Sequence, residues 1–133
     1  MTAPFSARYA PALDTPSLAR HELERWLPPS LGESVRGALR LLVSELVTNS
    51  IRHAAASAAH VALDARITDG TIRVEVCDQG AGFAPREPVP REAAEGYGGY
   101  GLFLVERMSS RWGVDTQHGT RVWFELDLAH VPR

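Results

Sequence analysis

The chain has 133 residues, of which 44 % are apolar and 23 % are charged, and its formal net charge is −2. These values are typical of one globular domain with a sizeable core, and they give no basic surface of the kind that binds nucleic acid. No apolar run approaches the ~20 residues of a membrane span, and no basic-then-apolar signal segment opens the chain.

The counts of cysteine and lysine indicate the cellular compartment and exclude some kinds of catalytic site. Cys77 is the only cysteine, so no internal disulfide can form and a reducing compartment fits best. We therefore expect a cytoplasmic protein. All 14 residues in the Lys+Arg count are arginine. The lack of lysine excludes the phosphate-loop lysine, the strand lysine of protein-kinase folds and Schiff-base chemistry.

The first half of the chain predicts one strand and two helices. Residues 5–9 alternate weakly and predict an edge strand. Residues 14–16 hold a capping residue and an early proline, which are typical of a helix start, and this helix should run to about residue 27. A longer helix is predicted over about residues 31–56. The expected apolar side of the first helix consists of Leu18, Leu23, Trp26 and Leu27.

The longer helix carries two polar residues beside its apolar stripe. Glu45 and Asn49 lie one turn apart and therefore share a face, which borders the stripe. A carboxylate and a carboxamide at the edge of a core suit a metal ion and a phosphate. The alternative is that both are ordinary solvent-exposed helix residues. The stripe, recurring at the 3.6-residue period, consists of Val35, Leu39, Leu42, Val43, Leu46, Val47 and Ala54.

Strands joined by tight turns are predicted after the long helix. Alternation over residues 61–67 predicts a strand, residues 69–70 are a strong hairpin turn, and residues 71–78 predict the partner strand. Asp78 has the parity of the core-facing residues of that strand. A carboxylate there is costly unless something bonds it, which indicates a site. The alternative is an aspartate that caps the next turn through backbone amides.

A segment rich in proline and glycine follows over residues 85–100, and we expect a mobile loop over a site. A helix is predicted from Gly101 to Met108. Residues 96–101 formally match G-x-G-x-x-G, but no buried strand precedes them, as a dinucleotide fingerprint requires. A glycine-rich segment that enters a helix exposes backbone amides and forms a general anion site. The alternative is a flexible linker with a helix cap.

Two more strands are predicted at the end of the chain, over residues 111–116 and 120–128, with a turn at 118–119. Thr120 has the parity of the core-facing residues of the last strand, so it too points inward near a strand end. The tail, residues 129–133, is expected to be loose.

The motifs occur in a fixed order: Glu45 with Asn49, then Asp78-x-Gly80-x-Gly82, then Gly99-x-Gly101-Leu102 and Thr120. With them, residues 35–127 resemble the GHKL-type ATP-binding superfamily of type II topoisomerases, heat-shock chaperones, histidine kinases and mismatch-repair proteins. The chain is most similar to the bacterial anti-sigma-factor serine/threonine kinases, which carry similar Glu-Leu-Val-Thr-Asn and Gly-x-Gly-Leu-x-Leu-Val segments.

The resemblance implies an α+β fold. This fold is a two-layer α/β sandwich, the Bergerat fold of histidine kinase-like ATPases, with helices on one face of a mixed, mostly antiparallel sheet. Residues 1–133 are then expected to form a single ATP-binding domain.

The resemblance also implies roles for individual residues. Glu45 would act as general base on an incoming hydroxyl, and Asn49 would hold Mg²⁺ against the ATP phosphates. Asp78 would accept a hydrogen bond from the adenine amino group, and Thr120 would support adenine recognition. Residues 96–101 would form the lid. The full expected nucleotide-binding set is Asn49, His53, Asp78, Gly80, Gly82, Phe83, Gly96, Gly98, Gly99, Tyr100, Gly101, Leu102 and Thr120. His53 has a second interpretation, as an ordinary histidine at the edge of the core.

The implied function is an anti-sigma factor that binds Mg-ATP and phosphorylates a serine on an anti-anti-sigma, STAS-type antagonist. It would alternately sequester a sigma factor, without contacting nucleic acid or membrane. A homodimer through the first strand and helix is also implied. Phe5, Tyr9 and Trp26 would either form an exposed patch for that dimer or belong to the core.

One departure from the family concerns the terminal phosphate. Many relatives carry an arginine just before the Gly-x-Gly of the lid, where this chain has Tyr97 and Gly98. The candidate substitutes are Arg52, Arg91 and Arg107. Two alternatives to a kinase therefore remain, a nucleotide-dependent binding module with slow or lost transfer, and an ATPase that uses water in place of serine.

Overall fold

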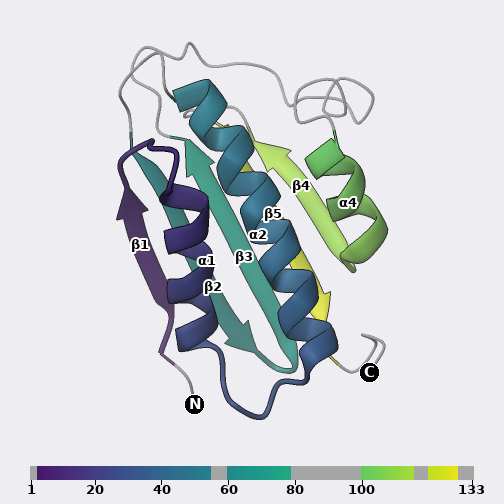
Figure 1. The fold of residues 1–133 in the computed structure, drawn as a ribbon. Helices are drawn as coiled ribbons and strands as arrows, with labels where there is room; N and C mark the ends of the chain where they lie inside the picture. Colours follow the sequence, from purple (N-terminus) through teal and green to yellow (C-terminus); the bar gives the residue numbers. More distant parts are fainter. Residues whose placement is uncertain (1–2, 55–59, 79–99, 116–119, 129–133) are drawn as a thin grey trace.

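The computed structural model describes residues 3–54, 60–78, 100–115 and 120–128 (Figure 1). They form a five-stranded sheet in the order β1-β2-β3-β5-β4, with the helices on one face. The two-layer α+β prediction is confirmed, and every strand pairing in this part of the chain is antiparallel. The elements are β1 (Phe5–Tyr9), α1 (Thr15–Trp26), α2 (Glu33–Ala54), β2 (Val61–Thr68), β3 (Thr71–Asp78), α4 (Tyr100–Met108), β4 (Arg111–Asp115) and β5 (Thr120–Asp127).

Helix α1 begins and ends close to the predicted residues, but its buried side differs from the prediction. Thr15, Ala19 and Leu23 are buried at a four-residue spacing, which places Leu18 about 100° around the helix from Ala19. Leu18 is 47 % exposed, so its assignment to the apolar core side was wrong. Asp14 occupies the N-cap without a side-chain cap hydrogen bond.

One arginine joins the end of α1 to the start of α2. The Arg36 guanidinium donates to the backbone oxygens of Pro28 at 2.5 Å, Leu31 at 3.1 Å and Glu24 at 3.4 Å. Carbonyl groups at and just after a helix C-terminus have no partner within the helix. Arg36 supplies that partner and so fixes the turn from which α2 departs.

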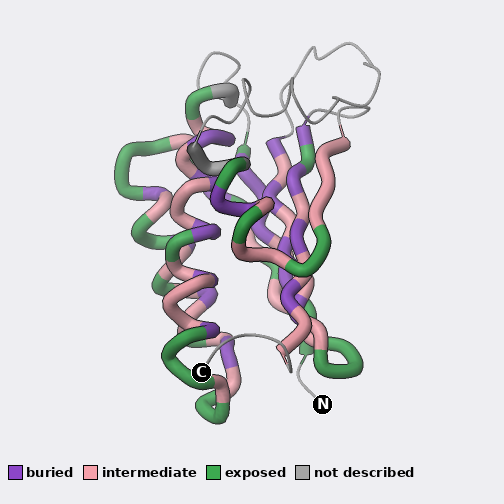
Figure 2. Tube along the Cα trace, turned by 90° about the vertical axis from the view of Figure 1, so that its right-hand side faces the viewer, coloured by how far each residue is buried: buried purple, intermediate pink, exposed green. Residues whose placement is uncertain are grey.

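Helix α2 lies across the middle of the sheet and carries most of the helical core (Figure 1). The apolar stripe is confirmed, and Figure 2 shows its buried side turned towards the strands. Ala54 closes the helix, but its side chain lies outside the described residues, as do residues 55–56 of the predicted helix. The buried stripe residues are Val35, Leu39, Leu42, Val43, Leu46 and Val47.

The β2–β3 hairpin fixes the register of the sheet. Asp69 and Gly70 have φ angles of 52° and 76°, and two consecutive positive φ values are characteristic of the type I′ turn that suits a two-residue hairpin. The predicted turn is therefore confirmed. Its register pairs Val61 with Asp78, and the next pairing sets Asp78 directly opposite Thr120.

The remaining elements also agree with the predictions, with α4 beginning one residue early, at Tyr100. Gly113 of β4 lies under Trp123 of β5, where an added Cβ would come within 2.7 Å of the indole nitrogen. The predicted loop up to residue 99, the turn at 118–119 and the tail at 129–133 lie outside the described residues. No helix in the described ranges is both long and apolar enough to cross a membrane.

Neighbouring leucines of α2 test the packing directly. Leu42 is fully buried, whereas Leu41 is 40 % exposed. Leu42→Ala should lower the free energy of unfolding by about 2–5 kcal/mol, because it leaves a cavity under the helix. Leu41→Ala, the matched control, should lower it by less than about 1 kcal/mol. Urea denaturation followed by circular dichroism measures both values, and equal losses would contradict the described packing.

Candidate functional site

The residues singled out from the sequence gather at one end of the sandwich. The last turns of α2, the end of β3, the start of β5 and the first turn of α4 all lie at the upper edge of Figure 1. Helix α2 and strand β3 run in the same direction, so the C-terminal part of the helix lies over the C-terminal end of the strand.

Glu45 and Asn49 occupy the helical wall of this end. Glu45 is half-buried, and Asn49 is only 8 % exposed although it is a carboxamide. The next residue, Ser50, is also buried. The sequence analysis did not single out Ser50, but it follows Leu46 by four residues and so continues the buried stripe, which was the signal for it.

Asp78 and Thr120 form the strand side of the same end. Asp78 is fully buried and Thr120 is 4 % exposed, so their predicted inward parity is confirmed. They are direct cross-strand partners between β3 and β5. The sequence predicted that each points inward near a strand end, but not that they face each other, because the β3–β5 pairing joins strands far apart in the chain.

Buried polar side chains are concentrated at this end. In the described ranges, the buried polar or charged residues are Thr15, Asn49, Ser50, Asp78 and Thr120. Three of these five were predicted as site residues. Burying polar groups costs free energy unless they are bonded, and ligand sites hold a few convergent polar groups in otherwise apolar surroundings. This concentration therefore supports a ligand-binding site at this end of the sheet.

Cys77 does not belong to the site, although it precedes Asp78. The side chains of adjacent strand residues point to opposite faces of the sheet, and Asp78 takes the helix-facing side. Burial raises the pKa of the Cys77 thiol. The thiol therefore stays protonated at neutral pH, and thiolate chemistry at this position is disfavoured.

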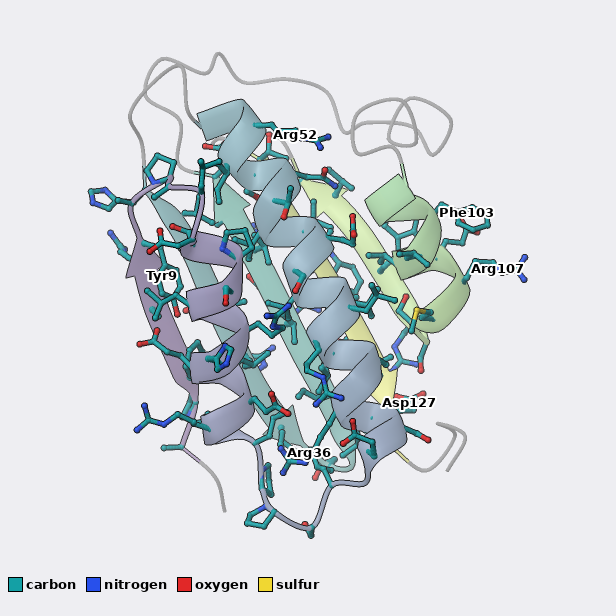
Figure 3. All side chains as sticks on the ribbon, in the orientation of Figure 1. Tyr9, Arg36, Arg52, Phe103, Arg107 and Asp127 are labelled. Atoms are coloured by element: carbon teal, nitrogen blue, oxygen red, sulfur yellow. The ribbon has the colours of Figure 1, made fainter. Side chains whose placement is uncertain are left out.

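The three arginines considered as partners of the terminal phosphate differ in where they lie relative to this end of the sheet. Arg52 is exposed on the last turns of α2, three residues after Asn49 and seven after Glu45, so it continues the same helix face. The Arg107 guanidinium lies 5.6 Å from the ring centroid of Phe103, and both side chains point away from α2 in Figure 3. Arg91 lies outside the described residues. Of the two candidates that the structure describes, Arg52 is therefore the one that lies at the same end of the sheet as Asn49, Asp78 and Thr120.

The other predicted ligand-binding residues are only partly described. His53 lies in the last turn of α2, and Tyr100, Gly101 and Leu102 form the first turn of α4, but their side chains lie outside the described residues. The remaining predicted residues lie wholly outside the described ranges. They are Gly80, Gly82, Phe83, Gly96, Gly98 and Gly99.

The described residues include no group of three or more His, Cys, Asp or Glu side chains arranged to hold a metal ion. Mg²⁺ in nucleotide sites is bound by one or two protein oxygens, by phosphates and by water. Asn49 provides a buried carboxamide and Glu45 a nearby carboxylate, a donor set that fits such a metal and not a closed protein cage.

Comparison with known proteins gives one family. The model of the histidine kinase-like ATPase domain matches residues 9–126. Curated proteins include no match to the chain.

Two solved structures are similar. The RsbU and RsbW domains of Rv1364c from Mycobacterium tuberculosis match with a TM-score of 0.72 and 20 % identity, over 96 % of this chain and 33 % of that one. The histidine kinase domain of the Erythrobacter litoralis EL346 blue-light activated histidine kinase matches with a TM-score of 0.55 and 28 % identity, over 72 % of this chain and 46 % of that one. This chain therefore spans less than half of either matched chain, and the first match supports the fold alone.

Proposed function

The chain belongs to the histidine kinase-like ATPase domain family, and on this premise we propose that it is an ATP-binding anti-sigma factor with serine/threonine kinase activity. Its substrate would be an anti-anti-sigma antagonist of the STAS type, and its alternative partner a sigma factor. The observation that carries the proposal is the burial of Asn49, Asp78 and Thr120 at one end of the sandwich. Residues 1–133 would act as one nucleotide-binding domain.

Adenine recognition is assigned to Asp78 and Thr120. Asp78 and Thr120 are direct partners on neighbouring strands. A buried carboxylate beside a hydroxyl suits adenine, which offers one amino donor and ring nitrogens that accept. Hydrogen bonds to a charged acceptor in a buried site are each worth about 1.5–3 kcal/mol. The fixed β3–β5 register would hold both groups without reorganisation when the nucleotide binds.

Phosphate handling and transfer are assigned to the α2 face. Asn49 would hold Mg²⁺ on the phosphates, and the bound Mg-ATP would supply the phosphoryl group. Glu45, one turn earlier, would accept the proton of the attacking serine hydroxyl. Arg52, one turn later, would contact the terminal phosphate, with a guanidinium geometry that suits phosphate oxygens.

A second function is favoured by one feature of the sequence. Tyr97 and Gly98 stand where many relatives have an arginine, so the chain would bind ATP and switch partners with little or no phosphoryl transfer. Slow hydrolysis with water as acceptor is a variant of the same possibility. Transfer of label from ATP to an antagonist serine distinguishes these functions.

The adenine site is tested by Asp78→Asn. Asparagine replaces the charged acceptor by a neutral one and turns one of its two acceptor oxygens into a donor, so ATP binding measured by calorimetry should weaken at least about tenfold. Asp69→Asn, in the exposed hairpin turn at the other end of the sheet, is the matched control and should bind as wild type. Unchanged binding by a folded Asp78→Asn protein would remove Asp78 from the site.

The role of Glu45 as base is tested by transfer from labelled ATP to a STAS-type antagonist. Glu45→Ala should reduce serine labelling by about 100-fold or more while ATP binding is retained. Glu33→Ala, in the exposed first turn of the same helix, should transfer normally. Labelling that persists in Glu45→Ala would sink the assignment. An unlabelled antagonist with tightly bound ATP in the wild type would favour the binding-module function.

Arg52 is tested by comparing ATP with ADP, which differ in the terminal phosphate. Arg52→Ala should weaken ATP binding about tenfold and leave ADP binding nearly unchanged, because only ATP offers the phosphate that Arg52 would contact. Arg107→Ala, whose side chain lies on Phe103, should alter neither affinity. Equal losses for ATP and ADP would mean that Arg52 acts elsewhere on the nucleotide or through the fold.

A further inference from the structure

A hollow of about 220 Å³ lies on the face of the sheet opposite the helices. Figure 2 shows the helices on one side of the strands, and the alternation along β2 and β3 turns the polar lining residues to the other side. Sites for drug-sized ligands measure roughly 300–1,000 Å³, so a ligand of this hollow must be small. The lining residues are Pro4, Phe5, Ser6, Asp64, Ala65, Arg66, Arg73 and Glu75.

The strand register sets like charges against each other in this hollow. Asp64 lies directly opposite Glu75, and Arg66 lies directly opposite Arg73. Like charges directly opposite each other destabilise a sheet. Exchanging Asp64 and Arg66 would place opposite charges in both pairs, so the native order is the less favourable one while the hollow is empty.

The two β3 members of these pairs are neutralised within the chain. Arg73 donates to Glu75 at 2.8 Å and to Glu125 at 2.9 Å. Arg121 approaches Glu75 to 3.6 Å from the β5 side. The Arg73 guanidinium also lies 4.2 Å from the centroid of the Trp123 ring. These contacts hold Arg73 and Glu75 in place beside the hollow.

The two β2 members differ in this respect. Neither Asp64 nor Arg66 forms an ion pair with any residue in the described ranges. They lie two residues apart on one strand, about 7 Å along it. A single small molecule can therefore reach both, if it offers a cation to Asp64 and an anion to Arg66.

The β1 side of the hollow is held by aromatic contacts. The Phe5 and Trp26 rings lie 5.9 Å apart, and the Trp26 indole donates to the Ala3 carbonyl at 2.7 Å. Tyr9, at the end of the same strand, is 7 % exposed and donates to Glu22 at 2.5 Å. These aromatic residues pack within the chain, which is the second of the two interpretations that their sequence allowed. The wall of the hollow is therefore formed before any ligand binds, which lowers the cost of binding.

We propose that this hollow binds a neutral α-amino acid with an apolar side chain. The ammonium group binds between Asp64 and Glu75, and the carboxylate binds between Arg66 and Arg73, where charge-assisted hydrogen bonds form. The apolar side chain lies towards Pro4. Each like-charge pair then holds an opposite charge, which accounts for a charge order that is unfavourable without a ligand. A metal cation or a phosphate would satisfy only one of the two pairs.

Titration with L-valine, followed by NMR of the backbone amides at low salt, tests the proposal. Residues 64–66 and 73–75 should show saturating shifts, with a dissociation constant on the order of 1 mM because the charges are partly exposed and screened by salt. L-Valinamide lacks the carboxylate and N-acetyl-L-valine lacks the ammonium group. Each should bind at least about tenfold more weakly than L-valine.

Neutral variants test the two unpaired charges separately. Asp64→Asn and Arg66→Gln should each raise the dissociation constant for L-valine at least about tenfold, because each removes one charged partner of the ligand. The matched controls are Asp69→Asn in the exposed hairpin turn and Arg25→Gln on the exposed side of α1. Both should bind L-valine as wild type does.

The exchanged variant, Asp64→Arg with Arg66→Asp, separates binding from folding. It should melt at or above the wild-type temperature and bind no L-valine, because both cross-strand pairs then join opposite charges within the sheet. A wild type without shifts at residues 64–66 and 73–75 would overturn the proposal. So would analogues that bind as tightly as L-valine, or a folded exchanged variant that binds it normally. The proposal does not depend on nucleotide, and ATP binding measured without L-valine keeps the two sites apart.

Discussion

The packing of α2 against the sheet is the constraint on which the rest of the structure depends. Its apolar stripe, from Val35 to Val47, is buried against the strands, and this burial fixes the rotation of the helix about its own axis. Because Glu45 and Asn49 border the stripe, the same rotation sets them at the rim of the core. A change in the phase of the stripe would turn both side chains away together.

The sheet supplies the second half of that end through its register. The type I′ turn at Asp69 and Gly70 aligns β2 with β3, and the β3–β5 pairing brings Asp78 opposite Thr120. A fully buried carboxylate is tolerated in a small domain only where bonds compensate its lost hydration. The burial of Asn49, Asp78 and Thr120 at the end that holds the last turns of α2 and the first turn of α4 is therefore the physical basis for assigning a polar ligand there, and the family gives that ligand as ATP.

Much of the fold follows from the sequence because period and turn chemistry are local properties. The strands, the hairpin and the stripe of α2 were predicted for this reason. Leu18 was assigned wrongly because a short amphipathic helix allows two apolar sides, and only contact with α2 and the sheet selects Ala19. The pairing of Asp78 with Thr120 depends on contact between strands that lie far apart in the chain. No local pattern could supply it.

The most direct test of the central claim is a titration of the protein with ATP, followed by two-dimensional NMR of the backbone amides. The account predicts shifts at Asp78, at Thr120 and in residues 49–52 of α2, while the amides of the 69–70 turn, at the other end of the sheet, stay unchanged. Absence of any shift, or shifts confined to the end of the sheet that holds the 69–70 turn, would contradict a nucleotide site at the end that holds Asp78 and Thr120.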